Sequence, residues 1–288
     1  VCERLMDGGG QVTIYNAASE KRVRTLTHPD SKQFTALAFS VDSKFLVTVG
    51  GAPDYTLVYW NWYQSKVIAS QRVNTQVKRV SFSPLDNVQL ATSGPGLLKL
   101  WRLQENSLKG FNLVSGKAAM QTFADHAWAP GERLLAVTEN GDVLVIEQGE
   151  LQGTIKSRLA GETINTIAVY SSGFIIAGSG TIVSVYEKND AKDRAEEREL
   201  YHHFKTFKSA DSLGEVTSLS LAPGEENLAV LFSSNQVATF PIASVDILKE
   251  EQNHFQFLGS GFHAGAITSI SVCVRKPLVA TCGTDRSV

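Results

Sequence analysis

The stretch QFTALAFSVDSKFLVTVGGAPDYTLVYWNW, residues 33 to 62, contains most of one structural unit and decides the fold. Residues 34 to 39 alternate apolar and small polar side chains, as a half-buried strand does, and turn residues follow them. Residues 45 to 49 form a near-continuous apolar run that is typical of a strand covered on both faces. A Gly-Gly pair and a proline end this run, and residues 56 to 60 continue as a third strand. Residues 67 to 73 predict a weaker fourth strand, so we expect a β-meander.

The pattern from Phe34 to Trp60 resembles a WD40 repeat. In such repeats a Ser or Thr of the second strand, an Asp of the next turn and a Trp of the third strand form a buried hydrogen-bond chain with a His that precedes the first strand. Thr48, Asp54 and Trp60 match the first three positions. A buried indole N–H and a buried carboxylate each need a partner. Each such bond contributes roughly 1 kcal/mol, and a partner left bare costs about 1–3 kcal/mol.

Similar runs recur along the chain at intervals of about 40 to 54 residues, the range in which repeat architectures are expected. The last aromatic or apolar position of the third strand is occupied in turn by Tyr15, Trp60, Trp101, Ile146, Tyr186 and Phe240. The matching position of the first strand is occupied by Phe39, Phe82, Trp128, Val169, Leu221 and Val272. The residues of the two series alternate along the chain at similar spacings, which favours a true structural repeat.

The repeat predicts an all-β fold, a WD40 β-propeller of about seven four-stranded blades, as one domain over residues 1–288. The units fall near residues 1–26, 33–73, 77–114, 122–158, 163–207, 214–263 and 266–288. The first unit lacks its first strand and the last stops inside its third, so both blades are expected to be incomplete in a fragment of a longer chain. The sequence leaves open whether the ring closes within these residues.

The last unit keeps three of the four polar positions of the repeat. His263 precedes its first strand, Thr281 lies in its second strand, and Asp285 lies in the turn that follows. The predicted structural network of the blades is therefore Thr48, Asp54, Trp60, Trp101, His263, Thr281 and Asp285.

Composition favours a soluble protein of the cytoplasm with a large core, because 43% of the residues are apolar. The formal net charge of −2 gives no basic surplus of the kind that nucleic-acid binding usually shows. No run of 18 apolar residues is present, and the start resembles no signal peptide, so no membrane contact is expected. Three cysteines are too few for a disulfide scaffold. Cys273 and Cys282 are expected to be small buried apolar residues.

Two polar segments interrupt the repeat between a third and a fourth strand. Residues 187 to 199 hold ten charged residues in thirteen, and residues 246 to 254 are similarly polar. Either both are solvated loops, or they form a mixed-charge docking surface on neighbouring blades. In the second case Glu196, Glu197 and Glu199 are the contact residues. Trp62 and Tyr63, just past the third strand of their unit, are further candidates for partner contact.

The sequence carries no catalytic, metal-binding or cofactor-binding pattern. Residues 8 to 10, Gly-Gly-Gly, lack the context of a phosphate-binding loop. The adjacent His202 and His203 would point to opposite faces of a strand and could not easily share a metal ion. Asp125 and His126 are expected in the loop before a first strand, in a structural role, since no nucleophile elbow accompanies them.

Beyond the repeat, the chain resembles the family of the cilia- and flagella-associated WD-repeat protein fifty-seven. The stretches that carry the resemblance are TLVYWNWYQSKVIA (56 to 69), RVSFSPLDN (79 to 87), VYEKNDAKDRAEERE (185 to 199) and HAGAITSISVCVRKPLVATCGTDRSV (263 to 288). The resemblance implies the first of two tandem propellers, followed in the whole protein by a coiled coil through which self-association is possible. It also implies a place in the ciliary or flagellar axoneme, within the cytoskeleton, and partners among axonemal proteins: inner dynein arm components, their docking complexes, and tubulin as a further candidate.

The first functional hypothesis is therefore a non-enzymatic scaffold that helps to dock inner dynein arms on doublet microtubules. A second is another WD40 adaptor, either for intraflagellar transport or as a ubiquitin-ligase substrate receptor. A third is a propeller enzyme, whose catalytic carboxylates or metal would gather at the mouth of the channel. The predicted turns offer only Asp54, Asn140 and Asp285, which do not form an evident cluster.

Overall fold

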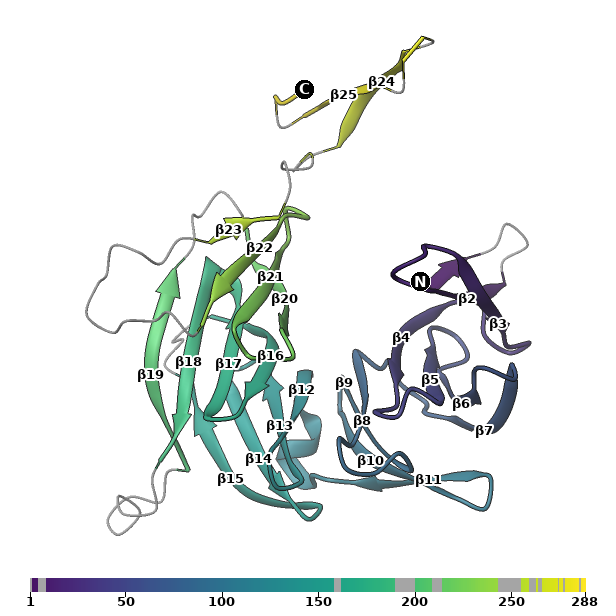
Figure 1. The fold of residues 1–288 in the computed structure, drawn as a ribbon. Helices are drawn as coiled ribbons and strands as arrows, with labels where there is room; N and C mark the ends of the chain where they lie inside the picture. The colour runs from purple at the N-terminus through teal and green to yellow at the C-terminus, as the bar shows by residue number, and fades with distance from the viewer. Residues whose placement is uncertain are drawn as a thin grey trace. The chain divides into compact units, whose positions relative to one another are not determined.

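The computed structural model of the chain describes residues 9–157, 162–189, 200–208, 214–242, 255–258, 263, 266–273, 275–276, 278–284 and 286–288, and the backbone of residues 2–4. The chain divides into two compact units, Val1–Arg158 and Leu159–Val288. In both units nearly all of the described regular secondary structure is β-strand, and the strands are joined in sequence order into antiparallel sheets (Figure 1). The predicted all-β class is therefore confirmed. The assignment of residues 1–288 to one domain stays a prediction.

The first unit contains one three-stranded sheet and three four-stranded sheets among its described residues. The three-stranded sheet consists of β1 (Cys2–Arg4), β2 (Gly10–Tyr15) and β3 (Arg22–Thr27). The next consists of β4 (Phe34–Phe39), β5 (Phe45–Gly50), β6 (Thr56–Asn61) and β7 (Lys66–Arg72). It is followed by β8 (Arg79–Phe82), β9 (Gln89–Gly94), β10 (Leu97–Gln104) and β11 (Ser107–Asn112), and then by the short 3₁₀ helix η1 (Gly116–Met120). The last sheet consists of β12 (Phe123–Ala129), β13 (Arg133–Thr138), β14 (Asp142–Glu147) and β15 (Glu150–Lys156).

The second unit contains two four-stranded sheets and one two-stranded sheet among its described residues. The first consists of β16 (Ile164–Tyr170), β17 (Gly173–Gly178), β18 (Ile182–Lys188) and β19 (Tyr201–Lys208), with the 3₁₀ turn η2 (Ser179–Thr181) before β18. The second consists of β20 (Val216–Leu221), β21 (Asn227–Phe232), β22 (Val237–Pro241) and β23 (Gln256–Phe257). The pair β24 (Ile267–Val272) and β25 (Val279–Gly283) completes it. The incomplete first and last sheets agree with the expectation from the sequence.

Strand register confirms the alignment of the repeats. One row of cross-strand partners, here called the marker row, recurs in every four-stranded sheet. Its members are Phe39–Leu46–Trp60, Phe82–Leu90–Trp101, Trp128–Leu134–Ile146, Val169–Phe174–Tyr186 and Leu221–Leu228–Phe240. The pairing of the last two strands shifts just before Tyr15, Trp60, Ile146 and Tyr186. A bulge is therefore found at the same position in four sheets. Tyr15 and Ile146 therefore occupy the position of Trp60, although neither is a tryptophan.

Apolar side chains fill the space between successive sheets of the first unit and between the two four-stranded sheets of the second. In the first unit, one cluster joins β1–β3 to β4–β7, a second joins β4–β7 to β8–β11, and a third joins β8–β11 to β12–β15. In the second unit a single cluster joins β16–β19 to β20–β23. Each fully buried aliphatic or aromatic side chain contributes roughly 1.5–3 kcal/mol, so these interfaces are the main source of stability.

The expectation that Cys273 and Cys282 are buried is wrong. Cys273 follows β24 and is exposed, and Cys282 on β25 is only partly covered. Alternation within a strand predicts which side chains share a face, but burial also requires a second layer against that face. Apolar side chains of this pair, such as Ile270 and Val279, are 64% and 59% exposed among the described residues.

Candidate protein-interaction surface

The predicted threonine and tryptophan of the blade network lie together in two sheets. Trp60 Nε1 donates a hydrogen bond of 2.9 Å to Thr48 Oγ1, and Trp101 Nε1 donates one of 2.9 Å to Thr92 Oγ1. The threonine stands two residues past the marker row on the second strand of its sheet. The equivalent residues of the other four-stranded sheets are Ala136, Ile176 and Val230. The second strand thus carries a threonine in the two sheets whose third strand has a tryptophan at the marker row, where the indole N–H needs an acceptor. It carries an apolar side chain in the three sheets that have no tryptophan there.

Asp54 does not join this hydrogen-bond chain. Its Oδ2 is buried without a hydrogen-bond partner, and so is Nδ1 of His28. The ring of His28 stands edge-on to Trp60, with ring centroids 6.1 Å apart. The network predicted from the sequence included no residue at the histidine position of this repeat, the one that contains Thr48 and Trp60. The position of His28, shortly before Phe34, is the signal that could have identified it.

In the last repeat His263 makes one contact that the repeat calls for, to Thr281, and a second contact to Ser287, which is not one of the four repeat positions. Its Nε2 lies 2.8 Å from Thr281 Oγ1, and its Nδ1 lies 2.9 Å from Ser287 Oγ. Asp285 lies outside the described residues, so its place in the network stays a prediction.

A second buried polar network lies between β8–β11 and β12–β15, centred on His126. The side chain is 1% exposed; Nδ1 lies 2.8 Å from Ser93 Oγ and Nε2 lies 2.7 Å from Ser81 Oγ. Ser81 Oγ also accepts a 2.9 Å hydrogen bond from Trp128 Nε1. The expectation of a loop at this place is wrong, because Asp125 and His126 lie within β12, at a bulge. Local sequence patterns do not indicate this network, since its serines come from a neighbouring sheet.

The geometry around His126 does not suit catalysis. Asp125 Oδ1 accepts a hydrogen bond from the backbone N–H of His126 and lies 3.6 Å from Arg79 Nε, so this bond does not orient the imidazole. Burial, together with the charge of Arg79, lowers the pKa of His126 to about 3. The ring is therefore neutral at pH 7 and holds two sheets together through its two nitrogens.

Trp62 and Tyr63 lie in the turn between β6 and β7 and form part of a surface aromatic cluster. The ring of Trp62 packs edge-on against Phe39 and Tyr63, with centroids 5.9 Å apart in both pairs. The Trp62 indole donates a 2.7 Å hydrogen bond to the carbonyl of Ser43, which fixes its orientation. Tyr63 is 65% exposed and Phe39 is 44% exposed. We call Phe39, Trp62, Tyr63 and the neighbouring Arg24 the Trp62 patch.

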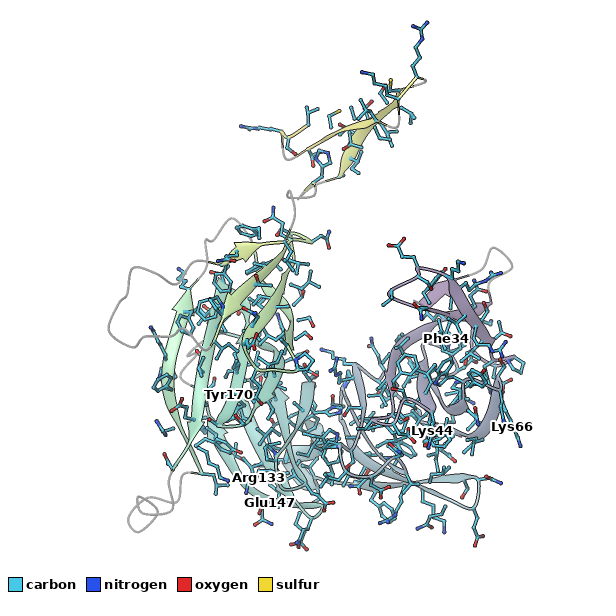
Figure 2. All side chains as sticks on the ribbon, viewed as in Figure 1. Phe34, Lys44, Lys66, Arg133, Glu147 and Tyr170 are labelled. Atoms are coloured by element: carbon cyan, nitrogen blue, oxygen red, sulfur yellow. The ribbon has the colours of Figure 1, made fainter. Side chains whose placement is uncertain are left out.

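The Trp62 patch carries positive charge at its edge. Arg24 Nε donates a 3.0 Å hydrogen bond to the carbonyl of Tyr63, and the guanidinium lies 5.5 Å from the centre of the Tyr63 ring. Lys66 begins β7 next to the same turn and is exposed, while Lys44 pairs with Asp42 at 3.5 Å (Figure 2). Arginine and aromatic side chains held by their own contacts are the residues that most often dominate binding at interfaces.

The charged segment of residues 187 to 199, called the charged insert from here on, begins with the last two residues of β18 and precedes β19, as the sequence indicated. Glu196, Glu197 and Glu199 fall outside the described residues, and so does the polar segment from 246 to 254. Their role as contact residues stays a prediction.

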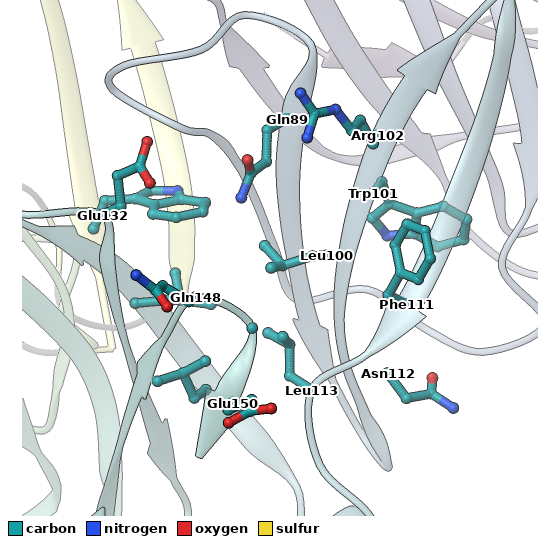
Figure 3. Close-up of a pocket in the computed structure, with 14 residues that line it drawn as sticks. Gln89, Leu100, Trp101, Arg102, Phe111, Asn112, Leu113, Glu132, Gln148 and Glu150 are labelled. Atoms are coloured by element: carbon teal, nitrogen blue, oxygen red, sulfur yellow. The ribbon is translucent and has the colours of Figure 1, made fainter. Parts of the chain in front are cut away.

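A groove of about 540 Å³ opens between β8–β11 and β12–β15 (Figure 3). Residues of β9, β10 and β11, with Leu113 just after them, form one wall, and residues of the strands and turns of β12–β15 form the other. Its lining consists of Gln89, Leu100, Trp101, Arg102, Phe111, Asn112, Leu113, Trp128, Glu132, Leu134, Ile146, Gln148, Gly149 and Glu150. The sequence did not indicate this groove, because its two walls come from different repeats.

The described part of the chain offers no other evident chemistry. It contains no group of three or more His, Cys, Asp or Glu side chains that could hold a metal ion. None of its described helical segments has the length and apolar character needed to cross a membrane.

Comparison with known proteins identifies the repeat. The family described as WD domain, G-beta repeat matches residues 20–61. The chain is also similar in structure to the β-propeller domain of Cps50 (Swd1) from Myceliophthora thermophila, with a TM-score of 0.72 and 15% sequence identity. That similarity covers 99% of this chain and 92% of the other. The fold predicted from the sequence, a WD40 β-propeller, is confirmed.

Several curated relatives are ciliary proteins. The chain is 30% identical to cilia- and flagella-associated protein 57 of Mus musculus, over 96% of this chain and 26% of that protein. It is 27% identical to cilia- and flagella-associated protein 57 A of Tetrahymena thermophila, over 93% of this chain and 22% of the relative. It is 26% identical to cilia- and flagella-associated protein 44 of Mus musculus, over 96% of this chain and 16% of that protein. The chain thus spans about a quarter or less of these relatives. Their names agree with the expected association with cilia and flagella, and the fold and relatives together point to a structural or interaction protein.

Proposed function

We propose that this chain is a non-enzymatic interaction scaffold of the ciliary or flagellar axoneme, which helps to position inner dynein arms on doublet microtubules. The observation that carries this proposal is the Trp62 patch, an exposed aromatic and cationic surface on two neighbouring sheets. The names of the relatives supply the cellular setting.

The patch suits docking because its side chains are ordered before any partner arrives. Trp62 is fixed by its bond to the Ser43 carbonyl, and Arg24 by its bond to the Tyr63 carbonyl. A side chain that is already immobile loses little conformational entropy on binding, so more of its contact energy is retained in the complex. Large aromatic side chains with one exposed face then supply most of that contact energy.

The test is carried out with the full-length protein in cells that build motile cilia or flagella. The variant combines Tyr63→Ala with Arg24→Glu, which removes the exposed ring and reverses the charge without opening the core. We expect the amount of protein retained on detergent-extracted axonemes to fall at least about fivefold, which corresponds to about 1 kcal/mol. Inner-arm occupancy in tomograms of the same axonemes should fall with it.

A matched control is Phe257→Ala, which removes another half-exposed ring, on β23 of the second unit. Retention of this variant should equal that of the unaltered protein. If the double variant is retained equally well, the Trp62 patch is not a docking surface. If its retention falls but inner-arm occupancy does not, the scaffold serves some other axonemal component.

The charged insert is proposed as a second contact surface. Reversal of Glu196, Glu197 and Glu199 to lysine should leave the melting temperature unchanged, because all three residues come after the end of β18 at Lys188 and before the start of β19 at Tyr201. Axonemal retention should weaken, and more so at low salt, where surface charges act over a longer range. Unaltered retention would mean that the insert is merely solvated.

A further inference from the structure

The groove in Figure 3 lies where the sheet β12–β15 lacks the threonine–tryptophan pair of the two preceding sheets. Ala136 and Ile146 occupy the positions of the hydrogen-bonded threonine and tryptophan. Isoleucine is much smaller than an indole ring and cannot extend as far toward the neighbouring sheet. The two sheets are packed together by the third apolar cluster of the first unit, and the groove opens beside it.

The base of the groove is apolar. Leu113, Leu134 and Ile146 belong to the apolar cluster between the sheets and also line the groove. Leu100 is only partly buried and lies between the two walls in Figure 3. Phe111 is 56% exposed and stands at one edge. A volume of about 540 Å³ lies within the usual range of roughly 300–1,000 Å³ for binding pockets.

The two walls differ in charge. Glu132, in the turn between β12 and β13, and Glu150, the first residue of β15, are exposed and have no ion-pair partner among the described residues. Arg133, which follows Glu132, is already paired with Glu147, and Figure 2 shows these two side chains together. On the opposite wall Arg102 faces Asp86 at 3.8 Å, so its charge is partly balanced. The groove therefore presents an apolar base beside uncompensated negative charge.

We propose that this groove binds an extended segment of a partner protein in which a lysine or arginine stands next to a large aliphatic or aromatic side chain. The apolar side chain lies against Leu100, Leu134 and Ile146, and the cation pairs with a carboxylate of the same wall, Glu132 or Glu150, which Figure 3 shows on either side of Gln148. The side-chain amides of Gln89, Asn112 and Gln148 line the groove and supply donors and acceptors for the backbone of an extended peptide. This inference goes beyond the proposed axonemal role and does not depend on it.

The test starts from a phage-displayed library of random peptides, selected on the 288-residue chain. We expect the enriched peptides to combine a basic residue with a neighbouring large apolar residue. A fluorescein-labelled copy of the most enriched peptide then serves as the probe in fluorescence polarisation. Glu132→Lys with Glu150→Lys should weaken its binding at least about tenfold, and high salt should weaken binding to the unaltered chain.

Two further variants separate shape from charge. Ala136→Thr with Ile146→Trp rebuilds the pair of the neighbouring sheets, narrows the groove and should abolish binding of the probe. Phe111→Ser removes the half-exposed phenyl ring at the edge of the groove, so it should weaken binding of the probe without affecting the fold. Glu105→Lys is the control, because it reverses an equally exposed charge on the β10–β11 turn. It should leave the affinity unchanged.

Enrichment of acidic peptides, or of peptides that bind Glu132→Lys with Glu150→Lys as well as the unaltered chain, would overturn the proposal. So would a library in which nothing is enriched over the control without protein. If the rebuilt pair prevents folding, as judged by circular dichroism, the surface variants decide the question alone. None of these results bears on axonemal retention, so the two proposals fail separately.

Discussion

The hydrogen bond between Trp101 and Thr92 should make a measurable contribution to the stability of the first unit. Thr92 is fully buried and Trp101 is 4% exposed, and their bond is 2.9 Å long. Thr92→Val keeps the shape of the side chain but leaves the indole N–H without its acceptor. Such a loss costs about 1–3 kcal/mol. With a urea dependence of about 2 kcal/mol per molar, the midpoint of unfolding should fall by roughly 0.5–1.5 M.

Intrinsic fluorescence is a selective assay for this change. All four tryptophans of the chain, Trp60, Trp62, Trp101 and Trp128, lie within the first unit, so their emission reports the unfolding of that unit alone. Circular dichroism recorded on the same samples reports both units. The control is Thr154→Val, at an exposed position of β15, which should shift the midpoint by no more than about 0.3 M.

A double-mutant cycle tests the reasoning more strictly. Trp101→Phe alone leaves the Thr92 hydroxyl buried without its donor, whereas the two substitutions together recreate the Val230 and Phe240 pair of β20–β23. The loss in the double variant should be smaller than the sum of the two single losses by about 1 kcal/mol. Strictly additive losses, or a Thr92→Val variant as stable as the unaltered chain, would show that the bond contributes nothing.

Two further perturbations follow from other parts of the structure. The folded-state pKa of His126, about 3, lies below the ordinary value of 6.5, so the unfolded chain binds more protons between these two values. The stabilisation of the first unit by neutral His126 should be fully present above about pH 6.5 and should be lost as the pH drops toward 3. His126→Gln should flatten this pH dependence of the free energy of unfolding, measured by urea titrations followed by fluorescence. If the pH dependence is the same in the variant, His126 is not its source. A Cβ at Gly173 would clash with the carbonyl oxygen of Tyr186, whereas one at Gly153 would meet no atom within 4 Å other than those of its own chain neighbours. Gly173→Ala should therefore lower the melting temperature by several degrees, which is the usual effect of about 1–3 kcal/mol, while Gly153→Ala should change it little; equal effects would refute the steric argument.

The repeat and its register were predictable because they rest on local patterns. Alternation of apolar residues and the spacing of Trp60 and Trp101 are properties of single strands and hairpins, and the sequence displays them directly. The position of Ile146 was also assigned correctly, although it is no tryptophan, because the apolar run that it ends fits the spacing of the repeat; the structure then places it at the same bulge.

The contacts between sheets could not be predicted in the same way. Whether Ser81 and Ser93 meet the ring of His126 depends on how two separate meanders pack, and nothing local encodes that. Asp54 matches the repeat by type and position, yet its Oδ2 has no hydrogen-bond partner in the structure, because side-chain direction in a turn depends on the backbone of that turn. The groove has the same origin, since its walls come from two repeats.

The outer hairpin formed by β18 and β19 is paired on both sides of its bulge although its connection is long. Pairing extends from Ile182 with Lys208 to Lys188 with Tyr201, and the N–H of Asn189 donates a 3.1 Å hydrogen bond to the carbonyl of Leu200 beyond it. Cross-strand bonds thus hold the two strand ends together, and the entropic penalty of a longer connection grows only with the logarithm of its length. For protein engineering, the interval between Asn189 and Leu200 is accordingly a permissive splice point, where an epitope or a fluorescent reporter can be carried without disturbing the sheet.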